Sequence, residues 1–540
     1  MTASFKNPGI SAPPPSSLFQ QDEFVRQIHE RVAVDGPVED DQLLFHIETM
    51  VTDIRKMLAS SYGPCGMNKL VYGPAGDVYL TSDGKTIIKE IDILHPVAVS
   101  LKRLGQSMNK SCGDGTKTAL LLACSLLKNA LPLLRKKVHP SAIVYGYELA
   151  MGKAYEMLEY ISEEADDKMI FSAVKSAAFG KGIDEDQAER IAGAMYAAVR
   201  EMNALVGDSF LDLERNVKVL KKAGAPEVIS ISGVILDETP AREDMPKFIE
   251  NPRVLLLRND IKVESGYINP EHFVKIDSPQ TAFAFANARR DAAAAYASKI
   301  VESGANLVFC EGEMDAVIEE ILAQKKILAY KRLKMKDMEY ISNATGADFM
   351  KIQDDAADMS LALGHADSIR VQKTRYETFA YLQAAGRPVI TVLIHEPMKY
   401  GLGKIEEAAD DALNNAALLL KNPYVVTGAG GTEYFLARSL RIYAHTLSGK
   451  EQLAVLAFSD AVEELAKSLA KNIGMDVIDA MIDLSAQQEQ GIDARLDTDR
   501  HVIGNDPIVY DCATVKKYAV IAATETAMNI LRVDEILLKK

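Results

Sequence analysis

The stretch Cys112-Gly113-Asp114-Gly115-Thr116-Lys117-Thr118 leads directly into an apolar run that begins at Ala119. Two glycines let the backbone approach an anion, and the first turn of a helix offers N–H groups that lack intrahelical partners. The threonine hydroxyls can add hydrogen bonds. The stretch therefore has the composition of a phosphate-binding loop that is not a Walker A loop, although Gly-Asp-Gly is equally the composition of an ordinary turn.

The overall composition indicates a large, acidic, globular chain. Its 540 residues include 61 Lys and Arg against 76 Asp and Glu, a net charge of −15 at pH 7. This length predicts several domains, and 48% hydrophobic residues suffice for sizeable buried cores. The acidic balance disfavours a general binder of nucleic acid or of anionic membranes, so a bound phosphate needs a local site.

The cysteines and the apolar segments predict a cytoplasmic protein. Five scattered cysteines lack the paired spacing of zinc ribbons or disulfide scaffolds, which favours a reducing compartment. The segment Met1 to Ser17 lacks the pattern of a secretory signal and is expected to be a flexible arm. The longest apolar run, Ala119 to Leu127, is far shorter than the ~20 residues that a membrane-spanning helix needs.

Hydrophobic periodicity predicts helical ends around an α/β middle. Leu43, Ile47, Val51, Ile54 and Leu58 fall on one helical face, and a second stripe comprises Phe458, Val462, Leu465 and Leu469. Strands are expected at 78–80, 217–221, 228–236, 254–257, 306–310, 328–332 and 389–394, and helices at 184–203, 282–303 and 315–325. The alternation between 282 and 332 predicts a βαβα module.

Further motifs in a fixed order point to a family. Tyr62-Gly63-Pro64-Cys65-Gly66-Met67-Asn68-Lys69 and Thr81-Ser82-Asp83-Gly84-Lys85-Thr86 precede the phosphate-loop candidate, and matching strings follow at 91–96, 139–141, 303–306, 449–454 and 531–536. With these strings the chain resembles a subunit of the group II chaperonins, the family of the archaeal thermosome and the eukaryotic cytosolic complex TRiC. The resemblance runs from about Leu43 to Leu537.

The resemblance implies a multidomain α and α/β chaperonin fold. Residues 21–150 and 403–540 would form a helical equatorial domain after a flexible arm at 1–20, and residues 151–216 and 369–402 a small intermediate domain. Residues 217–368 would form the inserted α/β apical domain, with a helical protrusion at about 262–295. Apolar residues of that protrusion could close a lid or contact unfolded protein, or simply pack on the apical core: Ile268, Phe273, Val274, Ile276, Phe283 and Phe285.

The resemblance also implies an ATP-dependent molecular chaperone that folds other proteins in a closed double-ring chamber with a built-in lid. The subunit would be an ATPase with ATP and Mg²⁺ as its cofactors. Its partners would be other chaperonin subunits in a stacked double ring, paralogues with eight per ring, together with unfolded client proteins. No nucleic acid and no membrane is expected among the partners.

Site residues follow from the resemblance position by position. Asp114 would hold the magnesium ion, Asp411 would orient the attacking water, and Asp83 would face the γ-phosphate; for each of these alone, a solvated surface carboxylate is the plainer interpretation. The remaining nucleotide-binding set would be Gly63, Pro64, Gly113, Gly115, Thr116, Lys117, Thr118, Lys181, Gly430, Gly431 and Asp511, with Gly428 beside the nucleoside and Asp511 at the ribose. The string Gly428-Ala429-Gly430-Gly431 departs from the usual three glycines plus alanine.

Two lysines depart from the family pattern and leave alternatives open. Lys117 replaces a phosphate-side threonine of many members, and Lys85 replaces a small residue. A cation near the triphosphate could strengthen binding or slow turnover, so a ring subunit that binds nucleotide but hydrolyses it weakly or not at all, with a role in assembly and substrate contact, is the alternative function. If both lysines point to solvent, neither effect follows. A stand-alone ATP-dependent enzyme would need a catalytic constellation that the middle of the chain does not offer.

Within the family, two subgroups remain open. Gly66-Met67-Asn68-Lys69, Lys117 and Arg532-Val533-Asp534 lean toward the theta subunits of the eukaryotic complex. His139-Pro140-Ser141 and the string at 449–453 resemble a thermosome equally well. A theta subunit implies a hetero-oligomer with seven paralogues, clients such as actin and tubulin, and prefoldin as a further candidate partner, whereas a thermosome implies one to a few subunit types.

Overall fold

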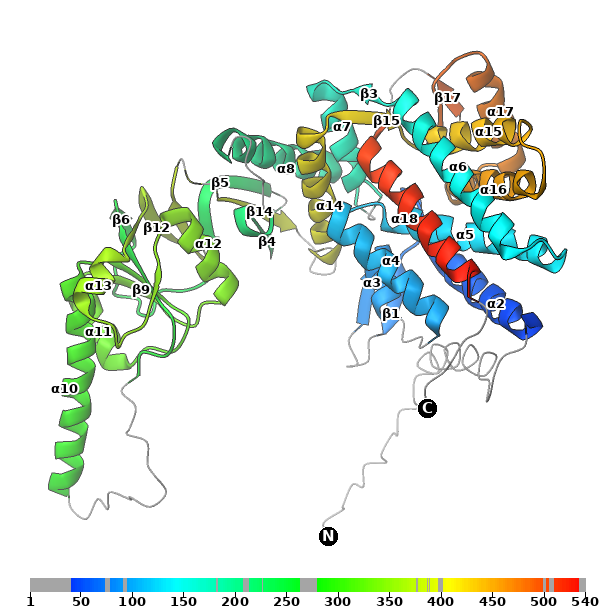
Figure 1. Cartoon of the computed structure of the whole chain (residues 1–540). Coiled ribbons are helices and arrows are strands. Elements are labelled where there is room, and N and C mark those ends of the chain that lie inside the picture. Colours follow the sequence, from blue (N-terminus) through cyan, green and yellow to red (C-terminus); the bar gives the residue numbers. More distant parts are fainter. Residues whose placement is uncertain are drawn as a thin grey trace, which may run out of the picture. The chain divides into compact units, whose positions relative to one another are not determined.

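The structure is a computed structural model. It describes residues 40–72, 78–90, 95–180, 183–206, 213–225, 227–262, 279–374, 377–385, 387, 389–396, 402–498, 502–504 and 509–533. The chain forms two compact units, the first from Met1–Glu185 with Lys421–Lys540 and the second from Asp186–Leu420 (Figure 1). The expected arm at 1–20 lies outside the described residues, and the finer division into three domains stays a prediction.

The first unit is mainly helical and is built from both ends of the chain. Its helices are α2 (Asp40–Ala59), α3 (Gly84–Glu90), α4 (Pro96–Cys112), α5 (Thr116–Arg135), α6 (Pro140–Ile161), α7 (Asp167–Ala178), α15 (Gly431–Ala444), α16 (Lys450–Ile473), α17 (Val477–Glu489) and α18 (Ala513–Leu531). Its strands are β1 (Lys69–Tyr72), β2 (Val78–Thr81), β3 (Glu163–Glu164), β15 (Tyr424–Thr427), β16 (Ala494–Leu496), β17 (Val502–Gly504) and β18 (Tyr510–Cys512).

Helix α5 lies in the middle of the core of the first unit. Every residue from Ala119 to Leu127 is buried, so the helix is apolar on all sides because other helices surround it. Among the described residues, α5 is the one helix long and apolar enough to cross a membrane, yet 67% of its most apolar window is buried inside the protein. Such burial is typical of a core helix. The phosphate-loop candidate therefore leads into the most buried helix of the unit.

The two predicted helical stripes are confirmed as core faces at the positions whose side chains the structure describes, which leave out Leu43. Ile47, Val51, Ile54 and Leu58 of α2 are buried, as are Phe458, Val462, Leu465 and Leu469 of α16. All of these side chains belong to one apolar cluster, which joins segments more than 300 residues apart in the sequence. The hydrophobic effect that holds the unit together therefore needs both ends of the chain.

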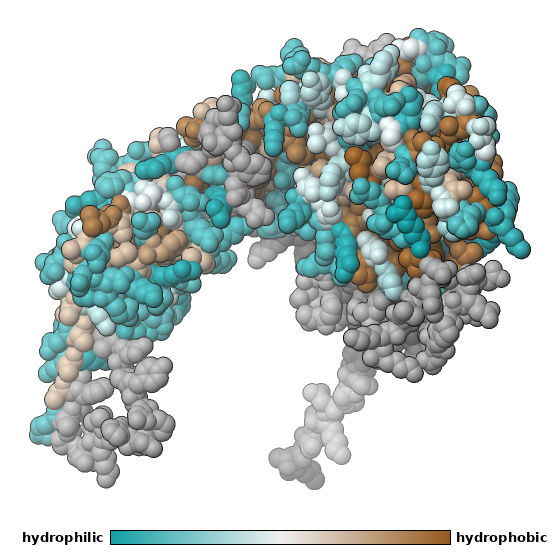
Figure 2. All heavy atoms as spheres, viewed as in Figure 1, coloured by the Kyte–Doolittle hydropathy of each residue, from teal (hydrophilic) through white to brown (hydrophobic). Residues whose placement is uncertain are grey.

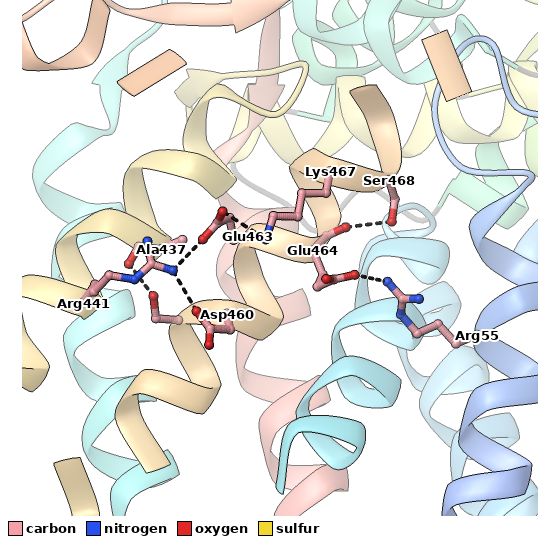
Figure 3. A network of polar contacts seen from close by, with 9 residues as sticks. Arg55, Ala437, Arg441, Asp460, Glu463, Glu464, Lys467 and Ser468 are labelled. Carbon is pink, nitrogen blue, oxygen red and sulfur yellow. Dashed lines mark hydrogen bonds and ion pairs between the residues drawn. The ribbon is translucent and has the colours of Figure 1, made fainter. Parts of the chain in front are cut away.

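A polar network crosses the same core along α16 (Figure 3). Arg441 of α15 pairs with Glu463 at 2.5 Å, and the next residue of α16, Glu464, pairs with Arg55 of α2. The Arg55 Nε donates a hydrogen bond to the Ser125 hydroxyl of α5 at 3.1 Å. Glu463 is buried, and its ion pair with Arg441 offsets the free-energy cost of removing the carboxylate from water. The network fixes α2, α5 and α15 relative to α16.

A three-stranded antiparallel sheet joins three remote segments of the first unit. β15 lies between β18 and β3, with Val426 opposite Asp511 and Tyr424 opposite Glu164. The sequence analysis did not predict these strands, because segments of two to four residues carry no readable alternation. The sheet brings the C-terminal part of the chain beside the segment that follows α6.

The second unit contains two sheets. Its helices are α8 (Glu185–Val206), α9 (Leu213–Asn216), α10 (Pro279–Ser303), α11 (Ala316–Gln324), α12 (Met335–Thr345), α13 (Ala356–Leu361) and α14 (Leu402–Lys421). Its strands are β4 (Val217–Ala223), β5 (Glu227–Leu236), β6 (Phe248–Glu250), β7 (Arg253–Leu257), β8 (Leu307–Cys310), β9 (Leu328–Tyr330), β10 (Phe349–Met350), β11 (Gly364–His365), β12 (Ser368–Lys373), β13 (Thr378–Gln383) and β14 (Ile390–Glu396).

The predicted βαβα module is confirmed. Strands β10, β7, β8 and β9 lie in this order and run parallel, with α10, α11 and α12 as the connections, and β11 adds to β7 in the antiparallel sense. The strand expected to reach residue 332 ends at Tyr330, because Arg332 has a left-handed φ of 60° that strand geometry does not allow. The second sheet has the order β4-β14-β5-β13-β12-β6.

Helix α10 includes the described part of the predicted protrusion. Residues 263–278 lie outside the described residues, and with them Ile268, Phe273, Val274 and Ile276, as does the side chain of Phe285. Phe283 is 71% exposed, whereas Ala293, Ala297 and Ile300 near the other end of the helix are buried. Figure 2 shows hydrophilic residues mixed with weakly hydrophobic ones along α10. The helix is thus anchored at its C-terminal half, and the lid role stays a prediction.

Two buried histidines predict a pH-dependent stability of the first unit. His95 is the N-cap of α4, where its Nδ1 accepts a hydrogen bond from the Val97 N–H at 3.3 Å, and its ring lies 6.4 Å from that of His46. Burial, and secondly His46, lowers the pKa of His95 to about 4. Between this value and the ordinary 6.5 only the unfolded chain binds the proton, so stability falls as pH drops through that range.

We expect the free energy of unfolding to fall by up to about 3 kcal/mol between pH 6.5 and pH 4 through this residue. The variant His95→Asn keeps an N-cap acceptor but cannot titrate. It should be less stable than the wild type at pH 7.5, because it loses packing, yet show a shallower decline with acidification. Denaturant unfolding followed by circular dichroism at several pH values measures both slopes; equal slopes would contradict the assignment.

Candidate functional site

The loop between α4 and α5 turns on two glycines. Gly113, with φ 72°, caps α4, and its N–H donates to the Asn109 carbonyl oxygen at 3.0 Å. Gly115, with φ 78°, is the N-cap of α5. Both values lie in the left-handed region that favours glycine. Because Gly115 has no side chain, no N-cap acceptor covers the first N–H groups of α5, and an anion is a suitable partner for them.

Asp114 lies between these glycines. It is half-buried, and its Oδ1 accepts a hydrogen bond from the Gly115 N–H. A magnesium ion prefers one or two carboxylates together with phosphate oxygens and water. Among the described residues no three side chains of His, Cys, Asp or Glu gather to hold a metal, so an ion at Asp114 would take its other ligands from phosphate and water. Asp114 and its loop fit that donor set.

The segment that contains Asp83 packs against the first turn of α5. Asp83 directly precedes α3, and its Oδ2 accepts hydrogen bonds from the N–H and the hydroxyl of Thr86 at 2.9 and 3.0 Å. A Cβ on the next residue, Gly84, would lie 2.6 Å from the Lys117 Cγ. Asp83 and the phosphate-loop candidate therefore lie in one neighbourhood. In this structure Asp83 already serves as a helix cap, a role that the sequence analysis did not predict.

The loop before β1 contacts α5 through two side chains. The Lys117 Nζ donates to the Ser61 carbonyl oxygen at 2.9 Å, and the hydroxyls of Tyr62 and Thr118 lie 3.2 Å apart. Burial, with Glu433 adding to it, raises the pKa of Tyr62, which is therefore a neutral phenol. Lys117 is thus engaged inside the protein rather than solvated, in contrast to the exposed Lys85.

Glycines from three further segments approach this loop closely. A Cβ on Gly180 would lie 2.9 Å from the Pro64 Cα. A Cβ on Gly63 would lie 2.3 Å from the Leu469 Cδ2, and one on Gly430 would lie 3.5 Å from the Leu469 Cδ1. Leu469 of α16 therefore separates Gly63 from Gly430 by one side chain. The packing leaves no room for side chains at Gly63 or Gly180 without a shift.

Asp511 lies in β18 with its side chain 26% exposed. The Ser176 hydroxyl of α7 donates to its Oδ1 at 3.1 Å, and the Lys516 Nζ of α18 lies 2.9 Å from its Oδ2. A Cβ on Gly428 would lie 3.0 Å from the Oδ1. Gly428, which follows β15, therefore leaves space beside the Asp511 carboxylate. Both oxygens of that carboxylate have a polar partner.

These contacts bring most of the predicted nucleotide-binding residues together in the first unit. They link the loop at 61–64, the segment at 83–84, the loop at 113–118, the glycines at 428–431 and Asp511. Asp411 is different, because it lies on α14 in the second unit, where it is buried. Its meeting with Asp83 and Asp114 stays a prediction, and Lys181 lies outside the described residues.

Sequence analysis missed the side chains that hold Asp511 and those that join the loops. Ser176 and Lys516 lie in ordinary helical sequence, and Glu433 simply follows the glycine string. One signal was available: Glu433 stands in the first turn of α15, two residues after Gly431, where a carboxylate can serve a helix N-terminus. Its partner could not be found, because that contact depends on the pairing of β15 with β18.

Two cysteines beside the candidate site, Cys112 and Cys512, are buried. Burial raises the pKa of the Cys112 thiol to about 12 and that of the Cys512 thiol to about 11. Both are therefore neutral thiols near pH 7, and a thiol is a poor nucleophile and a poor metal ligand. The chemistry of this region rests on carboxylates, hydroxyls, lysines and backbone N–H groups.

Comparison with known proteins identifies the family. The model of the TCP-1/cpn60 chaperonin family matches residues 54–540. The chain belongs to this chaperonin family. A thermosome subunit of Methanopyrus kandleri is 33% identical over 496 residues, which cover 90% of each chain. The thermosome subunit alpha of Methanothermobacter thermautotrophicus is 34% identical over 489 residues, which cover 90% of this chain and 89% of that one.

The chaperonin is thus similar to group II subunits along nearly its whole length. The predicted multidomain α and α/β chaperonin fold is confirmed, and so is the predicted class of function, a molecular chaperone subunit of a ring assembly.

We expect Gly428→Ala to weaken ATP binding about tenfold, the worth of a hydrogen bond to a charged group. The added Cβ would lie 3.0 Å from the Asp511 Oδ1 and would displace a carboxylate held by two partners. Titration calorimetry on the purified chaperonin measures the change.

Gly152→Ala is the matched control, because nothing lies within 4 Å of the Cβ it would add. It should bind ATP like the wild type. If Gly428→Ala also binds like the wild type, the Gly428 side of Asp511 does not contact nucleotide.

Proposed function

We propose that this chaperonin subunit binds ATP with Mg²⁺ in its first unit and hydrolyses it to drive protein folding in a closed double ring with a built-in lid. The observation that carries the proposal is the pair of left-handed glycines around Asp114 at the uncapped start of α5. The buried Ser82 hydroxyl adds support, because it has no hydrogen-bond partner among the described residues and lies next to Asp83.

The proposed roles follow the position of each residue. Asp114 would hold the magnesium ion, which when bound neutralises charge on the phosphates. The N–H groups of the first turn of α5 and the hydroxyls of Thr116 and Thr118 would bind phosphate oxygens. Asp511 would accept hydrogen bonds from the ribose, with Gly430 and Gly431 beside the nucleoside.

Hydrolysis requires further carboxylates. Asp411 would orient the attacking water, and Asp83 would face the γ-phosphate. Lys181 would respond to the bound nucleotide. Binding in this proposal rests on residues of the first unit, whereas turnover also needs Asp411 of α14. Binding and hydrolysis are therefore separable by mutation.

The position of Lys117 supports the second candidate function, a subunit that binds nucleotide and turns it over weakly. Its side chain begins in the first turn of α5, and its Nζ is held 2.9 Å from the Ser61 carbonyl oxygen. An ammonium group fixed beside a phosphate loop stabilises bound anions, including products. Lys85 is exposed and has no such position.

Subunit identity and partners are part of the proposal. We favour a theta-type subunit of a cytoplasmic hetero-oligomer with eight paralogues per ring, clients such as actin and tubulin, and prefoldin as a delivering partner. The relatives named alpha and beta, both from Methanothermobacter thermautotrophicus, support the thermosome alternative, a ring of few subunit types.

Native mass spectrometry and electron microscopy of the particle purified from its own cells test this assembly. We expect a double ring of sixteen subunits, twice the proposed eight per ring, with seven other chaperonin chains at equal stoichiometry. One or two chain types in the ring would overturn the theta assignment and leave the chaperonin class intact. A monomeric particle would overturn the ring proposal.

Steady-state ATP hydrolysis by the purified full-length subunit, without paralogues that contribute ATP sites of their own, tests the two catalytic proposals. Lys117→Thr should raise kcat about threefold or more, because it removes a fixed cation that stabilises the ground state and products. Asp411→Ala should lower kcat about a hundredfold and leave the ATP affinity nearly unchanged, because it removes the group that orients water.

Lys85→Thr is the control for the first substitution, since the exposed Lys85 should not affect turnover. Equal kcat for wild type and Lys117→Thr would remove the weak-turnover hypothesis. An unchanged kcat in Asp411→Ala would remove Asp411 from the mechanism.

A further inference from the structure

An ion-pair triad includes Asp511, the predicted ribose contact. Lys516 of α18 pairs through Nζ with the Oε1 of Glu433 in the first turn of α15, and the same Nζ lies 2.9 Å from the Oδ2 of Asp511 in β18. The three residues come from three elements that the sequence separates by up to 83 positions. The sheet that pairs β15 with β18 is what brings them together.

Burial increases stepwise from Asp511 to Glu433. The side chain of Asp511 is 26% exposed, that of Lys516 is 14% exposed, and that of Glu433 is 4% exposed. Asp511 is thus the most exposed member of the triad. Lys516 contacts the Asp511 carboxylate, and Glu433 contacts Lys516. Both residues therefore act on Asp511 rather than on a ligand.

Lys516 remains a cation in this environment. Burial by itself would lower its pKa, but Asp511 and then Glu433 outweigh burial and raise the pKa well above its ordinary value. One ammonium group therefore serves two carboxylates. A lysine with a single surface partner exchanges freely with water, whereas a second, fully buried carboxylate keeps Lys516 in place.

Both oxygens of Asp511 have a fixed partner. Lys516 holds Oδ2, and the Ser176 hydroxyl of α7 donates to Oδ1 at 3.1 Å. A carboxylate oxygen can accept two hydrogen bonds, so each oxygen retains a lone pair for a ligand hydroxyl. A carboxylate held in this way presents its remaining lone pairs in one orientation, and such preorganisation removes part of the entropic cost of binding.

Glu433 has a further property that a purely structural ion pair would not need. Its Oε2 is buried and has no hydrogen-bond partner among the described residues. An unsatisfied buried carboxylate oxygen carries an energetic cost, which the protein tolerates here while Lys516 bridges to the more exposed carboxylate. The triad carries one net negative charge, located on the side where Asp511 is accessible.

We propose that Lys516 and Glu433 are positioning residues that fix the Asp511 carboxylate for the sugar hydroxyls and thereby select ribonucleotides over deoxyribonucleotides. This inference rests on the proposed binding of ATP in the first unit. It adds two residues without direct ligand contact, and it assigns to them sugar selectivity rather than phosphate binding.

Binding of ATP, 2′-deoxy-ATP and 3′-deoxy-ATP to the purified full-length subunit, without paralogues whose own nucleotide sites would mask the change, tests the proposal. Titration calorimetry should show that the wild type prefers ATP over at least one deoxy analogue by about tenfold or more, the worth of a hydrogen bond to a charged group. In Lys516→Met the ratio should fall to about twofold, chiefly through weaker ATP binding, because the freed Asp511 carboxylate no longer has a fixed orientation.

Three further variants separate this role from a general structural one. Lys517→Met removes the neighbouring lysine, which lies 3.7 Å from Glu159, and should keep the wild-type ratio. Lys516→Met combined with Glu433→Gln avoids an unpaired buried carboxylate, so it should fold where Lys516→Met alone fails and should show the same loss of selectivity. Asp511→Asn should also lose the preference for ATP over the deoxy analogues. Combining it with Lys516→Met should not change the ratio of affinities further, because the two residues act as one unit.

Several results would overturn the proposal. A folded Lys516→Met variant with the wild-type ratio would show that Lys516 does not position Asp511. Equal weakening for ATP and both deoxy analogues would mean that Lys516 contacts phosphate or supports the fold only. A wild type that binds ATP without sugar preference would remove the ribose role of Asp511, whereas a wild type that binds none of the three nucleotides would overturn the proposed function itself.

Discussion

Burial of α5 on all sides is the constraint on which the first unit depends. The helix begins at the candidate phosphate loop and continues through the middle of a core to which both chain ends contribute. Because its body cannot move without opening that core, the N–H groups at its first turn keep a fixed position. Loops that bind ligands are usually mobile, so binding must order them at a cost in conformational entropy. This loop is already held by a core helix on each side.

The sequence predicted the elements whose signal is local and long. The stripes on α2 and α16 repeat over three or four turns, and the βαβα module alternates long helices with buried strands, so hydrophobic periodicity sufficed for both. The strands β3, β15 and β18 were not predicted, because each is at most four residues long and their pairing joins positions near 164, 425 and 512. No local pattern contains that information.

The same distinction applies to the candidate site. Residues inside contiguous motifs, such as Gly113 to Thr118, could be named from the resemblance, and the structure brings most of them together. Ser176, Glu433 and Lys516 could not, since their contacts with one another and with Asp511 exist only after β15 and β18 pair. Asp83 shows a further limit, because its capping of α3 depends on where that helix begins rather than on the motif itself.

The order of the segments along the chain has a consequence for biosynthesis. The second unit is continuous in sequence, so a ribosome synthesises all of it before it makes residues 421–540 of the first unit. The first unit must wait for β18 and α18, which come within the final 31 residues. A nascent or C-terminally truncated polypeptide would therefore expose the apolar faces of α2, α4 and α5 to solvent and would itself need protection by a chaperone until synthesis ends.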